Sequence, residues 1–253
     1  MPGSDVPPAQ PLTTFIVHGT GGAGPLAIDA GSLGLVGEPV DMARVREVIL
    51  THAHIDHIAT LPMWIEALLS QDRAPVAVHG TQDTIEQLRK HFFNGVIFPD
   101  FEQLAEKDGR QLMEYRLVPE DRAFGLAGFS LEAIRAEHPI ETHGYFVDDG
   151  VTEVLFASDS GPSERLWQAC EGRERLKAVF LETSFPDFME DIAESAGHLT
   201  PGLLAEELKR APEQVQVFIT HMKPAYRDGI TRSIQALNDP RVHLVIPGQE
   251  LEI

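Results

Sequence analysis

Short runs of β-branched and apolar residues recur along the chain, and Gly, Pro and polar residues separate them. Runs of this length and composition, bounded by turn-forming residues, are typical of β-strands. The pattern therefore predicts strands at residues 14–18, 26–29, 45–50, 76–79, 129–135, 145–148, 154–157, 178–181, 215–220 and 242–246.

Helical spacing appears between these runs. Apolar side chains recur at positions 58, 61, 65, 68 and 69, with Pro62 in the first turn. Thr200 followed by Pro201 is typical of a helix cap with proline at the first helical position. We predict helices over 58–69, 82–92 and 201–210. Strands and helices in this proportion indicate an α/β fold in which two sheets pack face to face with helices outside, a four-layer αββα sandwich.

Length and composition favour one domain. A chain of 253 residues with 43% hydrophobic content can bury a sizeable core. We predict a flexible N-terminal arm at residues 1–12 and a single domain at 13–253. The arm lacks the basic start and apolar run of a signal peptide, and no later stretch is apolar for the roughly 18 residues that span a membrane. We therefore expect no membrane partner.

Charge and cysteine content restrict partners and location. The formal net charge of −19 opposes binding of a long nucleic acid, because such binding needs a basic surface that releases counterions. A small anionic ligand remains compatible with this charge. The lone Cys170 rules out an internal disulfide and indicates a buried small hydrophobic residue in a reducing compartment. We expect a cytoplasmic protein.

The segment THAHIDHI at residues 51–58 carries the strongest chemical signal. It places His52, His54, Asp56 and His57 directly after an apolar strand. Imidazole and carboxylate groups are the ligands that suit zinc, manganese and iron, and their density here lets one loop bind two adjacent ions. We predict a metal centre at this strand end.

Three further candidates share that placement. His138, Asp159 and His221 each follow a predicted strand. A strand end holds a side chain rigidly, while the following loop gives access to the site. The other histidines in apolar segments, namely His18, His79, His91 and His243, have no predicted partner, and we expect them to be packed or solvated side chains.

The order His-x-His-x-Asp-His followed by distant His, Asp and His resembles the metallo-β-lactamase superfamily over nearly the whole chain. More narrowly, the sequence resembles the class II cyclic-nucleotide phosphodiesterases. That resemblance rests on HFFNGVIFPDF (91–101), LETSFPD (181–187), SAGHLTP (195–201) and ITHMKPAY (219–226). The loop after His138 differs from the family pattern, with Glu141 and His143 where a proline and an apolar residue are expected. Thr60 and Pro62, after the metal motif, differ as well.

The resemblance implies a dinuclear site with two divalent transition-metal ions, zinc first and manganese or iron as alternatives. His52, His54 and His138 would hold one ion, Asp56, His57 and His221 the other, and Asp159 would bridge them. A hydroxide shared by the ions would attack phosphorus. Asp56 could also orient this nucleophile through a hydrogen bond.

Two groups of residues are implied around the substrate. Related tRNA-processing endonucleases pair a His and a Glu near the leaving group, and His198 and Glu182 occupy similar places here. His198 would protonate the departing sugar oxygen and Glu182 would orient it. Asn94, Phe98 and Asp100, with Phe101, are candidates for the nucleotide pocket, with core packing as an equal alternative. His143 could contact the substrate.

Four functions compete at this point. The resemblance favours hydrolysis of cAMP, or also cGMP, to the 5′-monophosphate. A tRNA 3′-end endonuclease would need a basic RNA-gripping insertion that the sequence lacks. A thioester or lactam hydrolase would leave the Glu182–His198 pair without a task, and a non-catalytic metal-binding module would not need a metal-activated water. The sequence leaves the native metal, the base preference and a homodimer open.

Overall fold

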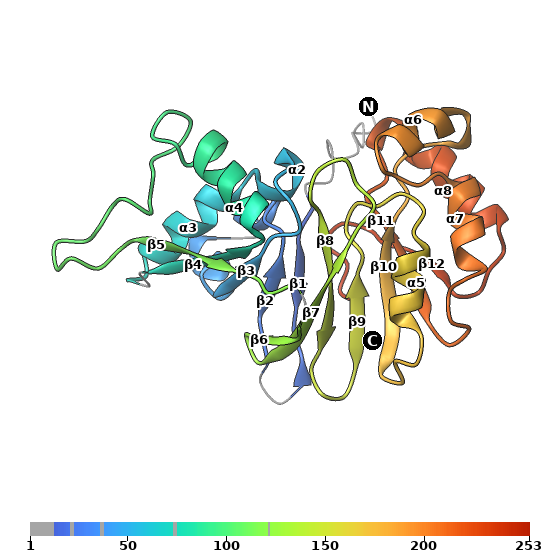
Figure 1. The fold of residues 1–253 in the computed structure, drawn as a ribbon, viewed down its shortest axis with the longest axis horizontal. Coiled ribbons are helices and arrows are strands. Elements are labelled where there is room, and N and C mark those ends of the chain that lie inside the picture. The colour runs from blue at the N-terminus through green and yellow to red at the C-terminus, as the bar shows by residue number, and fades with distance from the viewer. Residues whose placement is uncertain (1–12, 21–22, 36–37, 73–74, 121) are drawn as a thin grey trace, which may run out of the picture.

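The structure, a computed structural model, describes residues 13–20, 23–35, 38–72, 75–120 and 122–253. The predicted arm at residues 1–12 lies outside the described residues. Within the described chain, two β-sheets lie side by side between helices at both ends of the molecule (Figure 1).

The first sheet has the strand order β1-β2-β3-β4-β5. In the described residues its strands are β1 (Phe15–Val17), β2 (Leu26–Ile28), β3 (Glu47–Ile49), β4 (Val76–Gly80) and β5 (Met113–Leu117). β1 pairs with β2 in antiparallel fashion, and every later neighbour is parallel. Parallel neighbours bring the carboxyl ends of β2, β3 and β4 to one edge, which is where the metal motif follows β3.

The second sheet has the order β12-β11-β10-β9-β8-β7-β6. Its strands in the described residues are β6 (Phe124–Leu126), β7 (Phe129–Arg135), β8 (His143–Asp148), β9 (Glu153–Phe156), β10 (Leu176–Glu182), β11 (Gln216–Thr220) and β12 (Val242–Leu244). The strands from β9 to β12 are parallel to one another, whereas β6 to β9 alternate in direction.

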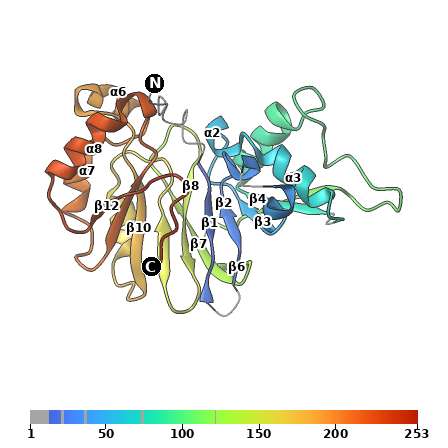
Figure 2. The same ribbon diagram turned by 180° about the vertical axis from the view of Figure 1, so that it is seen from behind.

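Helices cover the outer faces of both sheets. They are α1 (Pro39–Met42), α2 (Ile55–Ile58), α3 (Leu61–Leu69), α4 (Gln82–Gln87), α5 (Glu164–Cys170), α6 (Glu190–Ser195), α7 (Pro201–Leu208) and α8 (Arg227–Ala236). A π-helical turn, η3 (Leu88–Phe92), continues α4, and 3-10 turns occupy η2 (Leu33–Leu35), η4 (Asp187–Met189) and η5 (Pro224–Tyr226). Seen from behind, α3 lies beyond the first sheet and α7 and α8 beyond the second (Figure 2).

The alternation of side chains along the strands builds the layers. In β8, Tyr145 and Val147 belong to the core between the sheets, while Phe146 belongs to the core under the helices of the second sheet. β2 behaves in the same way, since Ile28 faces the inter-sheet core and Ala27 faces the helices of the first sheet. Successive residues of a strand point to opposite faces, so a strand that is apolar on both must be covered on both. The predicted four-layer αββα sandwich is confirmed.

Most predicted elements are confirmed with shifts of a few residues at their ends. The helix expected over 58–69 begins at Leu61, and Ile58 ends the separate turn α2. The helix expected over 82–92 changes from α to π at Leu88. The predicted cap is present, since the Leu203 amide donates to Thr200 Oγ1 at 3.2 Å. Strands β5 and β6 and helices α1, α5, α6 and α8 were not predicted.

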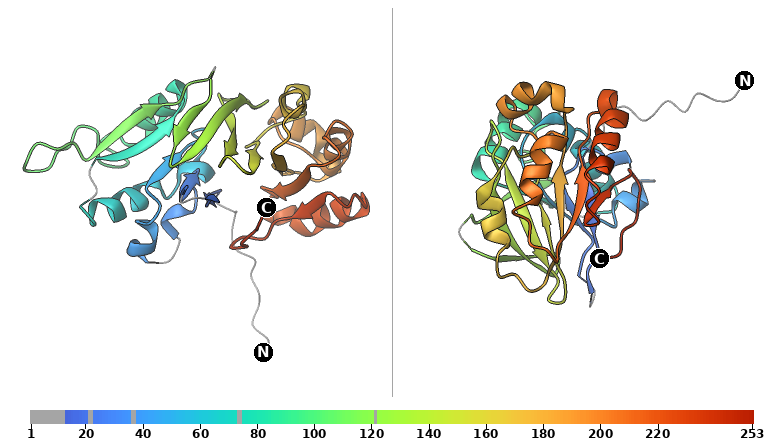
Figure 3. Two further views of the ribbon diagram at one scale, coloured as in Figure 1. Left: turned by 90° about the horizontal axis from the view of Figure 1, so that it is seen from below. Right: turned by 90° about the vertical axis from the view of Figure 1, so that its right-hand side faces the viewer.

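The segment between η3 and β5 projects away from both sheets at one end of the molecule (Figure 3). None of the described helices has the length and apolar character that crossing a bilayer requires.

Candidate metal centre

The metal motif lies at the carboxyl end of β3, where the chain turns into α2. His52 and His54 belong to the connecting loop, and Asp56 and His57 belong to the first turn of the helix. The loop is fixed to the segment after β2, because the Ala30 amide donates to the His57 carbonyl at 2.7 Å. The sheet edge therefore holds the motif through its backbone before any ligand contributes.

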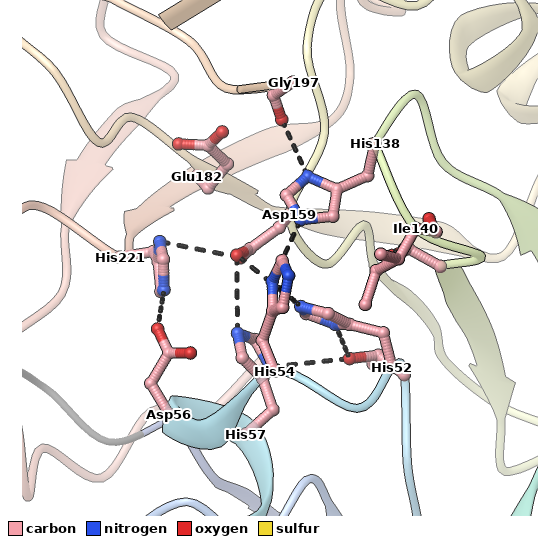
Figure 4. A network of polar contacts seen from close by, with 12 residues as sticks. His52, His54, Asp56, His57, His138, Ile140, Asp159, Glu182, Gly197 and His221 are labelled. Atoms are coloured by element: carbon pink, nitrogen blue, oxygen red, sulfur yellow. Dashed lines mark hydrogen bonds and ion pairs between the residues drawn. The ribbon is translucent and has the colours of Figure 1, made fainter. Parts of the chain in front are cut away.

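One group of potential ligands gathers around His54. Its Nδ1 lies 3.1 Å from His52 Nε2 and 3.2 Å from His138 Nε2. An Asp159 oxygen completes this group, whose ligand atoms all lie within 4.8 Å of one another (Figure 4). The sequence predicted these residues as one set of ligands.

The second group consists of Asp56, His57 and His221, again with ligand atoms within 4.8 Å. His221 Nε2 lies 3.1 Å from Asp56 Oδ2. Asp159 faces this group as well, since its two oxygens lie 3.4 Å from His57 Nε2 and 3.5 Å from His221 Nδ1. The structure thus brings all seven predicted ligands together and places Asp159 between the two groups (Figure 4).

Neighbouring groups bond to the ring nitrogens that face away from the centre. His57 Nδ1 donates to Asp29 Oδ2 at 2.7 Å, and His138 Nδ1 donates to the Gly197 carbonyl at 3.1 Å. His52 Nδ1 lies 3.0 Å from Thr51 Oγ1. Such bonds fix the tautomer that leaves Nε2 available to a metal ion.

Burial and charge divide the histidines into two kinds. Burial lowers the pKa of His52 and His54, and it lowers that of His138 to about 4, so these imidazoles are neutral at pH 7. Burial also disfavours the charged form of His57, but the Asp159 and Asp29 carboxylates outweigh it and hold the pKa well above its usual value. Conversely, burial alone would raise the pKa of Asp159, and the charges on His221 and His57 hold it well below its usual value.

The residues fit a pair of divalent transition-metal ions. His57 Nε2 is buried and has no hydrogen-bond partner in the described chain, although its other nitrogen is bonded. An unpaired buried nitrogen is costly unless a ligand satisfies it. Imidazole nitrogens and carboxylate oxygens are the donors that zinc, manganese and iron accept.

His198 and Glu182 form the predicted pair beside the centre. His198 Nδ1 lies 2.9 Å from Glu182 Oε1, and both side chains are buried. The Leu199 amide donates to the same carboxylate oxygen at 3.0 Å. His198 also lies within 4.8 Å of Asp159 and His221, so a ligand role competes with an acid role.

Two residues of the site were missed from the sequence. Asp29, at the end of β2, accepts hydrogen bonds from the Thr51 amide at 2.8 Å and from the Thr51 hydroxyl. Ser184 donates to Glu182 Oε2 at 2.7 Å and lies 2.9 Å from His221 Nδ1, so it joins the pair to the metal ligands. Asp29 carried a usable signal, because it follows an apolar strand as His138 and Asp159 do.

Three of the predicted substrate residues make local contacts in the segment that follows η3. Asn94 Oδ1 accepts from the Val96 and Ile97 amides at 2.9 Å, and Asp100 Oδ1 accepts from the Gln103 amide at 3.3 Å, so both shape the projecting segment. Phe98 packs against Phe93 and Phe101. This packing corresponds to the core alternative that the sequence left open.

His143 is buried at the start of β8, and its Nδ1 has no hydrogen-bond partner in the described residues. Its backbone amide donates to the Thr51 carbonyl at 3.1 Å and so supports the metal loop. His79 is a packed and His243 a solvated side chain, as expected, and each has a partner that the sequence did not indicate. His79 Nε2 lies 2.9 Å from Glu47 Oε2, and His243 Nε2 lies 2.6 Å from Gln216 Oε1.

A pocket of about 610 Å³ opens beside His54. Its lining includes Ile55, Asp83, Gln87, Phe92, Ile140 and Glu141. Asn94, Phe98, Asp100 and His143 are not among the lining residues, whereas His91, for which no role was expected, is one of them. A pocket of about 740 Å³ lies between α8 and β12 and contacts none of the metal-site residues.

Comparison with known proteins agrees with this geometry. Residues 30–222 match the family described as "Beta-lactamase superfamily domain". The chain is 24% identical over 238 residues to a probable 3′,5′-cyclic-nucleotide phosphodiesterase of Yersinia pestis, covering 81% of this chain and 66% of that protein. It is 25% identical over 239 residues to a 3′,5′-cyclic-nucleotide phosphodiesterase of Aliivibrio fischeri, covering 81% and 69%.

Solved structures show the same fold. The metallo-β-lactamase fold protein YhfI of Bacillus subtilis superposes with a TM-score of 0.74 at 19% identity, over 96% of this chain and 92% of that one. Unliganded yeast PDE1 superposes with a TM-score of 0.67 at 19% identity, over 81% and 67%. The family match covers most of the chain and includes every predicted ligand, so the chain belongs to the beta-lactamase superfamily and has the metallo-β-lactamase fold.

Proposed function

We propose that this chain is a metal-dependent phosphodiesterase that hydrolyses 3′,5′-cyclic nucleotides to 5′-monophosphates. The observation that carries the proposal is the convergence of two ligand groups on Asp159, with the His198–Glu182 pair beside them. The names of the two bacterial relatives support a cyclic-nucleotide substrate.

In this proposal His52, His54 and His138 would hold one ion and Asp56, His57 and His221 would hold the other, with Asp159 shared between the two groups. When bound, the ions supply Lewis acidity toward the phosphoryl oxygens and increase the acidity of water. Zinc is our first choice, with manganese or iron as alternatives.

The chain's own groups position and move protons. Burial alone would raise the pKa of Asp56, but its hydrogen bond to His221 and the charge on His57 hold it at about 2. Asp56 is therefore a carboxylate that can accept a hydrogen bond from the attacking water. His198 protonates the departing 3′ oxygen, and Glu182 orients its imidazole through Nδ1.

Two alternatives receive less support. The short form of human tRNase Z superposes with a TM-score of 0.60 at 18% identity, a likeness that concerns the fold. A net charge of −19 opposes the binding of a long RNA. A thioester or lactam hydrolase would use the metal ions and leave the His198–Glu182 pair without a task.

The test compares substrates on metal-loaded protein. We expect cyclic nucleotides to be hydrolysed to 5′-monophosphates, a tRNA precursor and a thioester to remain intact, and ¹⁸O from labelled water to enter the phosphate. A 3′-monophosphate as the main product, or label on the sugar hydroxyl, would refute attack at phosphorus with the 3′ oxygen leaving.

Metal analysis tests the dinuclear site separately. Protein purified without chelator should approach two transition-metal ions per chain. Asp159→Ala should lose at least one, because the Asp159 carboxylate faces both ligand groups. An active preparation without metal would contradict the proposed site.

A further inference from the structure

One face of helix α4 and its π turn η3 lines the pocket of about 610 Å³ beside the potential ligand His54. Asp83, Gln87 and His91 are spaced four positions apart, so they share that face of the helix. Phe92, five positions after Gln87, joins them where the helix widens into the π turn. A molecule whose phosphate lies at the ligand groups can therefore reach this face with its remaining part.

The opposite side of the pocket is apolar. Ile55 and Ile58 of α2 line it, together with Ile140 of the loop that follows His138. Ile140 lies beside His54 in the close view of the ligand groups (Figure 4). Apolar walls that face a few polar groups in a cleft of this size are typical of a site for a flat ring.

The polar groups of the pocket include two accessible oxygens. Gln87 Nε2 donates to Asp83 Oδ1 at 3.1 Å. A carboxylate oxygen can only accept, so this bond fixes which end of the Gln87 amide is the nitrogen. Gln87 Oε1 and Asp83 Oδ2 have no hydrogen-bond partner in the described chain, and neither oxygen is buried. The pair therefore offers two acceptors to a ligand, one of them charged.

We propose that this pocket binds the base of the nucleotide and that Asp83 and Gln87 select adenine over bases with a 6-oxo group. This inference rests on the proposed phosphodiesterase function. The 6-amino group of adenine has two N–H donors, one for each free oxygen of the pair. Guanine and hypoxanthine have a carbonyl oxygen at this position, which would face the two acceptors without a proton between them.

The first measurement is kcat/KM for cAMP and for inosine 3′,5′-cyclic monophosphate (cIMP), whose base is hypoxanthine. We expect cAMP to be favoured by about tenfold to a hundredfold, the range that a bidentate contact to a base edge gives. Equal values for the two substrates would refute adenine selection. A preference for cGMP over cAMP would refute it as well, because guanine would then be read at another edge.

Asp83→Asn changes the charge and keeps the size of the side chain. An amide at position 83 can donate to a 6-oxo group, so the ratio of cAMP to cIMP should fall by about tenfold or more. Gln87→Met removes the other oxygen at similar length and should also bring the ratio toward one.

Glu164→Gln in α5 is the matched control for Asp83→Asn. Glu164, like Asp83, is an acid in the first turn of its helix that accepts from a glutamine four positions later, since Gln168 Nε2 donates to its Oε1 at 2.9 Å. Its side chain is exposed and does not line the pocket. We expect its cAMP to cIMP ratio to equal that of the unmodified protein. Thermal unfolding of both variants measures any loss of stability from the missing first-turn charge.

Calorimetric binding of 5′-AMP and 5′-IMP to metal-loaded protein separates the two proposals. If neither cyclic nucleotide is hydrolysed but 5′-AMP binds more tightly than 5′-IMP, and Asp83→Asn removes that difference, the base pocket is supported and the proposed reaction is refuted. If both are hydrolysed and Asp83→Asn leaves the ratio unchanged, or lowers both rates equally, adenine selection is refuted while the reaction stands.

Discussion

Asp29, Ser158 and His221 have positive φ angles of 63°, 63° and 56°. A residue other than glycine adopts this region at a cost of about 1–3 kcal/mol, and such residues concentrate at functional sites. Each of the three follows a strand. His221 is a potential ligand, Ser158 precedes the potential ligand Asp159, and Asp29 is the hydrogen-bond partner of His57. A positive φ is part of the backbone geometry at Asp29 and His221, whose side chains reach the centre.

At this scale, Asp29→Asn should weaken metal binding by about 10- to 100-fold, because asparagine offers one accepting oxygen where Asp29 uses two, one for the Thr51 amide and one for His57 Nδ1. Asparagine tolerates a positive φ, so the backbone should be retained. Metal titration monitored by calorimetry measures the effect.

Glu47→Gln is the control for this change, since it disrupts another carboxylate–histidine pair, Glu47–His79, that contains no predicted ligand. It should leave metal affinity unchanged. Equal losses in both variants would mean that Asp29 acts through general stability.

The variant His198→Ala tests whether His198 is the general acid that protonates the leaving oxygen. Turnover of a cyclic nucleotide should fall by about 10² to 10⁴, while metal content stays unchanged. An aryl phosphodiester such as bis(p-nitrophenyl) phosphate expels a stabilised anion and should be much less affected. Glu182→Gln should give a weaker version of the same contrast.

His243→Ala, which changes an exposed histidine on β12, should have no effect on either substrate. Loss of metal from His198→Ala would instead mean that His198 is a ligand of the ion that Asp159 and His221 hold.

At the scale of elements, the segment after β2 packs directly on the metal loop. A Cβ at Gly31 would lie 1.8 Å from the Asp56 carbonyl oxygen, so only glycine lets these backbones approach. Gly31→Ala should therefore destabilise the fold by about 1–3 kcal/mol and also reduce metal affinity.

Gly229→Ala, in α8, is the matched control because a Cβ there meets nothing within 4 Å. Since alanine is favoured over glycine in helices by up to about 1 kcal/mol, this variant should unfold at the same or a higher temperature. Similar melting temperatures for both variants would contradict the close packing at Gly31.

For the whole molecule, Cys170 reports on global opening. It is buried in α5, as the sequence predicted, and burial raises the pKa of its thiol to about 12. The thiol is therefore protonated at pH 8, and a disulfide reagent should react slowly with folded protein and rapidly in denaturant. Rapid reaction without denaturant would mean that the core around α5 opens locally. The homodimer and the cytoplasmic location stay predictions of the sequence.

The sequence by itself determined the sandwich and the set of potential ligands. Strands such as β8 and β10 are apolar on both faces, so their runs are visible without tertiary information. The ligands are recognisable because four of them lie within six positions and the other three follow strands. β5 was missed because its residues, MEYRL, alternate apolar with polar side chains, whereas the prediction used continuous apolar runs. α8 was missed because its residues, RDGITRSIQA, bury only Ile230 and Ile234.

Only the tertiary structure decided which polar groups meet. Asp29 lies 28 positions from His57, and Ser184 lies 37 positions from His221, so no local pattern indicates either contact. The pocket is likewise formed by α2, α4 and the loop after His138, which are distant in sequence. Hydrophobic periodicity is a local property that burial imposes on each strand, whereas a hydrogen bond between strand ends depends on how the sheet orders those strands. For that reason Glu141 stands out by its unpaired oxygen in the folded chain, and from the sequence only as a departure from the family pattern.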